Sequence, residues 1–178
     1  MSDDMTLLVD GEADKILCYN KEQVDDKLVT ISQCQNCTIY ILGCPSLVVI
    51  NGCNRSLVFV ATCTGSISYR NNDHGTLVAT CRQFRAYRSN FYFYGFVTTD
   101  PVFEECYCNI QENGASFDKL QDMLKERGFT GRNKVTSARN FTPGVGDIRV
   151  VEERSLPATE HLPQHYSSQH IHGVTLFA

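Results

Sequence analysis

Short segments in which apolar residues alternate with other residues dominate the middle of the chain. Four pairs of apolar residues recur about every ten positions, and the members of each pair are two positions apart: Leu47/Val49, Leu57/Phe59, Ile67/Tyr69 and Leu77/Ala79. Such an alternation places both members of a pair on one face of a β-strand. Turn-forming residues, including Pro45, Gly52 and Gly65, separate the pairs. The pattern predicts a succession of short strands joined by tight turns.

The cysteines repeat over about twice that interval. Their spacings are 18 or 19 residues, from Cys34 to Cys53, from Cys44 to Cys63 and from Cys63 to Cys81. A beat of ten residues fits either an antiparallel meander or the two sides of a coil of about twenty residues. The cysteine interval favours the coil, because small apolar side chains that return every second strand form a ladder inside a solenoid. We therefore predict a mainly β protein with a right-handed parallel β-helix of about four coils over residues 28–111.

Helix signals follow the predicted coils. Ser116 suits a helix N-cap, an apolar stripe with helical spacing comes next, and Gly128 is a typical helix end. These signals predict a helix over about 117–127 that packs against the solenoid. Beyond it we predict a short strand over 148–151 and an irregular, Pro- and His-containing tail.

The distribution of charged residues changes along the chain and helps to divide it into regions. The first 30 residues carry eight acidic residues against three lysines, and no lysine lies between Thr30 and Phe117. We divide the chain into an acidic N-terminal segment (1–27), a β-helix domain with its C-terminal helix (28–154) and a tail (155–178). A net charge of −4 without a basic stripe argues against a nucleic-acid partner.

The cell compartment follows from the N-terminus and the cysteines. No apolar run is long enough to span a bilayer, and residue 2 is serine rather than the glycine of a myristoylation signal. Nine cysteines without a secretory signal indicate a reducing compartment and no disulfides. We expect a cytoplasmic protein without an integral membrane segment.

Metal binding is not expected either. Cys34 and Cys37 form one CxxC motif, but no second CxxC follows it. The four histidines between residues 161 and 172 lie in a tail in which Pro163 interrupts helical spacing.

The densest group of chemically versatile residues follows the fourth alternating segment. It contains three arginines within seven residues, namely Arg82, Arg85 and Arg88. If Phe84 is buried, the alternation changes phase at a corner just before it, and Gln83 and Arg85 project outward beside each other. An exposed guanidinium on a stiff backbone suits contacts to phosphate or carboxylate. The alternative from the residues alone is that these arginines solvate one face or pair with Glu104 and Glu105.

Three segments resemble the tubulin cofactor C family domain, also called the C-CAP/cofactor C-like domain. They are Cys81-x-Gln83-Phe84-Arg85, Pro101-Val102-Phe103-Glu104 and Asn140-Phe141-Thr142-Pro143. The likeness covers roughly residues 28–154. It implies a β-helix that activates GTP hydrolysis, either by Arf-like small GTPases or by tubulin with its cofactors. One departure is Arg82, which stands where the family usually has the first of two glutamines.

The resemblance also implies the role of each site residue. Arg85 would be an arginine finger accompanied by Gln83 and Glu104, although counting along the chain could equally select Glu105 as the acid. The residues expected to bind the GTPase are Arg82, Tyr87, Arg88, Glu105, Asn140 and Phe141. GTP and Mg²⁺ belong to the partner, so we expect no cofactor and no independent enzyme activity.

The expected partner is an Arf-like GTPase in its GTP form, with tubulin as a second candidate, at the cytoskeleton or the ciliary base. A non-catalytic adaptor for tubulin, a GTPase or a ciliary protein is the alternative function. Gln83 beside Arg85 favours the activator, whereas Arg82 in place of glutamine favours the adaptor.

Overall fold

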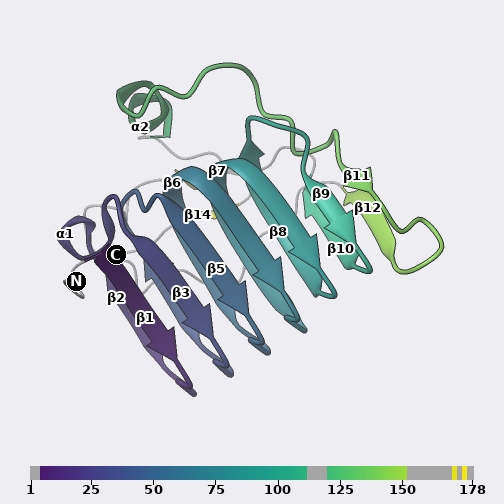
Figure 1. Cartoon of the computed structure of the whole chain (residues 1–178), viewed down its shortest axis with the longest axis horizontal. Coiled ribbons are helices and arrows are strands. Elements are labelled where there is room, and N and C mark those ends of the chain that lie inside the picture. The colour runs from purple at the N-terminus through teal and green to yellow at the C-terminus, as the bar shows by residue number, and fades with distance from the viewer. Residues whose placement is uncertain (1–4, 112–119, 152–169, 172–173, 176–178) are drawn as a thin grey trace.

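Parallel strands succeed one another along the long axis of the molecule, from β1 at one end to β12 at the other (Figure 1). This computed structural model describes residues 5–111, 120–151, 170–171 and 174–175 of the 178-residue chain. Strand β1 pairs with β3, β3 with β5, and β5 with β6, always in parallel. The chain is therefore a parallel β-helix of about six turns, which confirms the predicted fold class and exceeds the predicted four coils.

The elements have the following bounds in chain order: β1 Thr6–Asp10, β2 Ile16–Tyr19, α1 Lys21–Val24, β3 Leu28–Ser32, β4 Thr38–Ile41, β5 Leu47–Asn51, β6 Leu57–Arg70, β7 Gly75–Tyr87, β8 Asn90–Val97, β9 Val102–Glu104, β10 Tyr107–Gln111, α2 Leu120–Glu126, β11 Arg139–Asn140, β12 Asp147–Val151, β13 His170–Ile171 and β14 Val174–Thr175. Strands β13 and β14 form a separate antiparallel pair.

Each turn contributes one strand to a front sheet and one to a back sheet. The front sheet consists of β1, β3, β5, residues 66–70 of β6, residues 83–87 of β7, β9 and β11. The back sheet consists of β2, β4, residues 57–60 of β6, residues 75–81 of β7, β8, β10 and β12. Strands β6 and β7 belong to both sheets, because each bends through a corner where the register between them shifts.

The β-helix begins before residue 28, where the sequence pattern placed its start. Thr6 already pairs with Leu28, so the segment expected to be only an acidic N-terminus supplies the first turn. This turn was missed because its interval is 22 residues rather than 18 or 19. Its acidic residues lie outside the coil, where they do not disturb the interior: Asp10 accepts a hydrogen bond of 2.7 Å from the Ser32 hydroxyl.

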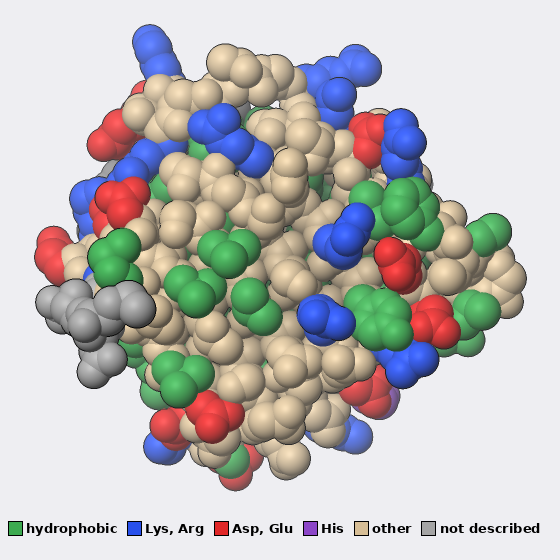
Figure 2. Space-filling view, in the orientation of Figure 1, with side chains coloured by type: hydrophobic (Ala, Val, Ile, Leu, Met, Phe, Trp, Pro, Cys, Tyr) green, Lys and Arg blue, Asp and Glu red, His purple; other side chains and the backbone are tan. Residues whose placement is uncertain are grey.

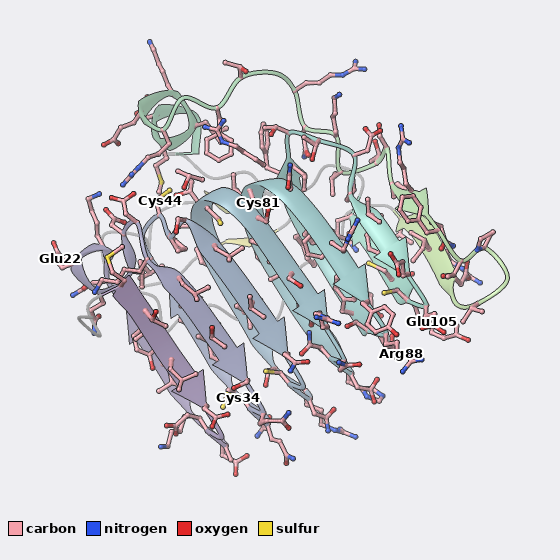
Figure 3. The ribbon with its side chains drawn as sticks, viewed as in Figure 1. Glu22, Cys34, Cys44, Cys81, Arg88 and Glu105 are labelled. Carbon is pink, nitrogen blue, oxygen red and sulfur yellow. The ribbon has the colours of Figure 1, made fainter. Side chains whose placement is uncertain are left out.

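Free cysteines form part of the interior, as predicted. The buried members of the ladder are Cys34, Cys44, Cys53, Cys63 and Cys81. Cys63 and Cys81 are direct register partners on β6 and β7. Figure 3 shows Cys34 at one end of the front strands and Cys44 and Cys81 at the other.

A cluster of aromatic rings fills the interior behind β7. Phe84 stacks on Phe93 with ring centroids 4.3 Å apart, and Tyr69 lies 4.3 Å from Phe91. Phe103 packs against Phe84 at 5.9 Å. Close-packed rings of this kind leave β7 little freedom to move, because any shift would open a cavity in the core.

One corner of each turn contains a residue in the left-handed backbone region. These residues are Gly11, Gln33, Gly52, Asn71, Arg88 and Glu105, with φ between 45° and 72°. The conformation costs a non-glycine residue about 1 kcal/mol or more, so the stacked turns must hold it in place. Beside this corner the buried Asn72 accepts a hydrogen bond from the Cys53 amide at 2.8 Å and donates one to the Ile50 carbonyl at 3.0 Å.

The alternating apolar pairs do not all face the interior. Ile67/Tyr69 and Leu77/Ala79 are core residues, but Leu57/Phe59 belong to a second cluster on the outside of the back sheet. Leu124 of α2 joins that second cluster, so the helix packs on the solenoid as predicted. Leu47/Val49 point outward from the front sheet and remain partly exposed.

Two C-terminal predictions are confirmed within the described residues. Helix α2 lies inside the predicted range 117–127, whose first residues and Ser116 fall outside the described part, and Gly128 ends it with φ of 71°. The predicted strand over 148–151 is β12, which pairs with β10. Most of the predicted tail lies outside the described residues. Neither described helix is long and apolar enough for a membrane crossing.

The cysteine environment leads to the first prediction. Burial raises the pKa of Cys53 and of Cys63 to about 12, whereas Cys18 is the one exposed thiol of the nine. A disulfide-exchange reagent at pH 8 should therefore label one thiol rapidly in the native protein and the other eight only as it unfolds. Cys18→Ser should remove the rapid phase; rapid reaction of several thiols in that variant would contradict the buried ladder.

Candidate functional site

Arg85 lies on the outside of the front sheet, near its C-terminal end. Phe84 and Ala86 are buried on the inside of β7, whereas Gln83 and Arg85 are exposed on the outside. This arrangement confirms the predicted change of phase before Phe84. Strand pairing holds Arg85 on both sides, with Ser68 of β6 as one register partner and Val102 of β9 as the other.

The Arg85 side chain is unpaired among the described residues. It makes no hydrogen bond or ion pair with any residue in the described part of the chain. Two shallow hollows of about 480 Å³ each lie beside it, and their combined lining includes Arg70, Tyr87 and Glu104 on one side and Gln83, Asp100 and Val102 on the other. An exposed, unpaired guanidinium above two hollows is free to contact an anionic group of another molecule.

Gln83 is positioned by the neighbouring coil. The Ser66 hydroxyl donates a hydrogen bond of 3.1 Å to the Gln83 side-chain oxygen, and the two residues are register partners. The oxygen is thus engaged within the sheet, which leaves the amide N–H groups of Gln83 as donors toward the surface.

The two adjacent acids occupy different places. Glu104 is the register partner of Tyr87 and lines the same hollow as Arg85. Glu105 is at the corner and accepts a hydrogen bond of 2.8 Å from Arg88, which raises the pKa of Arg88 (Figure 3). Of the two acids that the sequence left open, the structure places Glu104 beside Arg85.

Tyr87 is held between two arginines, of which the sequence analysis singled out only one. The guanidinium carbons of Arg88 and Arg70 lie 5.1 and 5.5 Å from the Tyr87 ring centroid. Arg70, Ser66 and Ser68 were missed because they precede the arginine-rich segment by one coil. The coil spacing would have found them, since the register partners on β6 and β7 are 17 residues apart at this point.

A distant loop brings Phe141 to the same face. Asn140 pairs with Phe103 through β11 and β9, and the Phe141 amide donates a hydrogen bond of 2.9 Å to the Phe103 carbonyl. The Glu105 amide donates one of 2.6 Å to the Thr142 hydroxyl, which fixes the end of the loop. The Phe141 side chain is 55% exposed, so it is not part of the core.

Arg82 is directed away from these residues. Its guanidinium donates a hydrogen bond of 3.0 Å to the Arg127 carbonyl at the end of α2 and lies 4.7 Å above the Phe129 ring. Arg127 in turn forms an ion pair of 3.1 Å with Asp25, in the first turn of the β-helix. The structure therefore gathers the predicted site residues except Arg82, which joins α2 to the solenoid.

Among the described residues, no three or more His, Cys, Asp or Glu side chains are grouped so that they could hold a metal ion. Cys34 and Cys37 instead direct their thiols to backbone carbonyls, those of Ser32 and Gln35, each at 3.4 Å.

Arg82 and Arg85 form a matched pair for a stability measurement. Arg82→Ala should lower the free energy of unfolding by about 1–3 kcal/mol, because it removes a charged hydrogen bond and a cation–π contact. Arg85→Ala should leave stability within about 0.5 kcal/mol of wild type, since the described residues offer Arg85 no partner that the change would remove. Denaturant unfolding of both variants tests this difference; equal stability of the two would show that the Arg82 contacts contribute nothing.

Comparison with known proteins identifies the family of the chain. A search of curated proteins gives no significant match. The family model described as tubulin binding cofactor C matches residues 26–141, which include the front-sheet residues around Arg85 and extend to Phe141. Because this match covers well over half of the sequence, the chain belongs to the tubulin binding cofactor C family.

Proposed function

We propose that the chain is a GTPase-activating protein that supplies Arg85 in trans to an Arf-like small GTPase. The observation that supports this most directly is the exposed guanidinium of Arg85 on a rigid sheet, which has no partner in the part of the chain that the structure describes. GTP hydrolysis spreads negative charge over the transferred phosphoryl group and the leaving oxygen. A cation held against that charge in a water-excluding interface accelerates hydrolysis by roughly 10³–10⁵.

Rigidity suits Arg85 to this task. Strands on both sides pair with β7, and the buried ring of Phe84 anchors the backbone beside it. The arginine would therefore lose little conformational freedom of its backbone when the partner binds, which is the advantage of a preorganised site. Glu104 is placed to orient the guanidinium once solvent is excluded, and Gln83 is placed to donate to an anionic oxygen.

Family membership supports a partner that handles GTP, and the family's name adds tubulin as a second candidate. One observation favours the adaptor function instead. Arg82 stands where the resemblance implies a first glutamine, and its side chain is directed to α2, so of these two positions only Gln83 offers an amide beside Arg85. Measurement of stimulated hydrolysis distinguishes an activator from an adaptor.

The direct test is a panel of purified Arf-like GTPases, each loaded with GTP and assayed for single-turnover hydrolysis with and without the chain. Tubulin forms a separate arm of the panel. Stimulation of one Arf-like member supports the proposal, whereas binding without stimulation in every case would identify an adaptor.

Arg85→Ala should abolish stimulated hydrolysis while a complex with the GTP-loaded partner still forms, because the cation acts mainly on the transition state. Arg85→Lys should restore little, since a single ammonium does not reproduce the planar guanidinium fork. Single-turnover rates at saturating activator measure the effect. Full stimulated turnover by Arg85→Ala would exclude the mechanism.

Phe141→Ala should weaken binding of the GTP-loaded GTPase by about 1–3 kcal/mol, because an exposed aromatic side chain is a typical interface anchor. The melting temperature should stay near that of wild type, since the ring is 55% exposed. Titration calorimetry measures the affinity, and Tyr92→Ala, on the back sheet and 39% exposed, is the control. Unchanged affinity in Phe141→Ala would place the interface elsewhere.

A further inference from the structure

An apolar patch covers the N-terminal part of the front sheet. It consists of outward side chains of three neighbouring strands: Leu8 of β1, Leu28 of β3, and Leu47 and Val49 of β5. Leu8 is 63% exposed and Leu47 is 37% exposed. Figure 2 shows hydrophobic side chains grouped over this part of the sheet, with charged side chains around the edge of the group and toward the C-terminal strands.

Strand register connects the patch to Arg85. One outward row runs through the register partners Leu8, Thr30, Val49, Ser68 and Arg85. A strand spacing of about 4.8 Å places Val49 about 10 Å from Arg85, with the small Ser68 between them. Phe141 follows β11, two strands from β7 in the opposite direction. Arg85 therefore lies about midway between two exposed apolar groups.

The four side chains of the patch are uncharged, and the Asp10 carboxylate of β1 lies at its edge, hydrogen-bonded to Ser32. The outward positions of β3 and β5 are Leu28, Thr30, Ser32, Leu47, Val49 and Asn51. A partner that covers this area removes water from one side of Arg85 at little desolvation cost. Exclusion of water lowers the effective dielectric constant around the guanidinium and so strengthens its electrostatic interaction with a negative charge. In protein interfaces, the residues that contribute most of the binding energy are typically surrounded by neighbours that exclude water.

Outer apolar side chains are covered on only part of the molecule, and Ile16, Tyr92 and Tyr107 of the back sheet are exposed as well. On the back sheet, Leu57 and Phe59 are buried in the second cluster together with Leu124 of α2. On the front sheet, Leu8 and Leu47 stay accessible beside an unpaired arginine. An exposed apolar patch of this kind marks an interaction surface. A standard interface buries about 800 Å² per partner, and a footprint of that size centred on Arg85 extends about 16 Å, as far as β3.

We propose that the patch is a second apolar contact for the same GTP-loaded GTPase, opposite Phe141 across Arg85. This inference rests on the proposed function and extends its interface over the N-terminal coils. It requires a partner that presents apolar side chains about 10–15 Å from the phosphate that Arg85 contacts, a distance set by the strand spacing. The patch contributes affinity and shields Arg85 from water.

Affinity measurements with four variants test the patch. The probe is the GTPase of the panel that wild type stimulates, loaded with a non-hydrolysable GTP analogue. Leu47→Glu should weaken its binding at least tenfold, because it buries an unpaired carboxylate, whereas Leu47→Met should bind within about twofold of wild type. Leu8→Glu, at the rim of the patch, should have a smaller effect. Its matched control is Ile16→Glu, which changes an equally apolar side chain of the same turn, 50% exposed on the back sheet, and should bind like wild type.

Each outcome supports or overturns the inference. Normal binding by Leu47→Glu, together with loss of stimulation in Arg85→Ala, would overturn the patch and leave the proposed function intact. Failure of every GTPase to bind or respond to wild type would overturn both. Self-association of wild type that Leu47→Glu abolishes, or binding of tubulin alone that it weakens, would assign the patch to another occupant. Circular dichroism and melting curves confirm that each variant is folded.

Discussion

Each turn of the β-helix hydrogen-bonds in parallel register to the turn before it, and this register decides which side chains become neighbours. In the successive coils from β1 to β9, residues 16 to 22 positions apart in the sequence lie on adjacent strands, as Thr6 and Leu28 do at one end and Ser68 and Arg85 near the other. The inward positions must be apolar and fit the neighbouring coils. The outward positions of the front sheet are free of that requirement, so a row of chemically different side chains can be displayed on a rigid surface.

The same stacking accounts for the corners that border the site. Arg88 and Glu105 occupy equivalent left-handed corner positions of successive turns, so their side chains meet and form an ion pair. Glu104, one residue earlier, still belongs to β9 and faces outward beside Arg85. One position along the chain thus separates Glu104, which lies beside Arg85, from Glu105, which pairs with Arg88 at the corner.

Segments from outside the regular coils complete the structure. The loop after β11 brings Phe141 to the end of the front sheet, while the residues after α2 connect the first turn to the bend of β7 through Asp25, Arg127 and Arg82. The outer surfaces consequently differ. The back sheet is partly covered by α2, and the front sheet presents Arg85 with apolar side chains on both sides. We propose the front sheet as the surface for a partner because Arg85 and these apolar side chains lie together on it.

The sequence alone determined the fold class, the buried cysteines and the exposure of Arg85. These features depend on local alternation and on a regular interval, both of which are visible in the order of residues. The phase change before Phe84 was enough to predict that Gln83 and Arg85 share the outer face. Family resemblance added Phe141, whose exposure the structure confirms.

The tertiary structure alone decided the first turn, the direction of Arg82, the choice between Glu104 and Glu105 beside Arg85, and the open apolar patch. The alternation of apolar and other residues predicts on which side of a strand a residue lies, but it does not predict which other segment covers that side. Arg82 is directed to the end of α2, 45 residues later in the chain, and Leu57 is covered while Leu47 is not. Contacts over such sequence distances depend on how the coils and the helix pack together, which no local pattern of residues encodes.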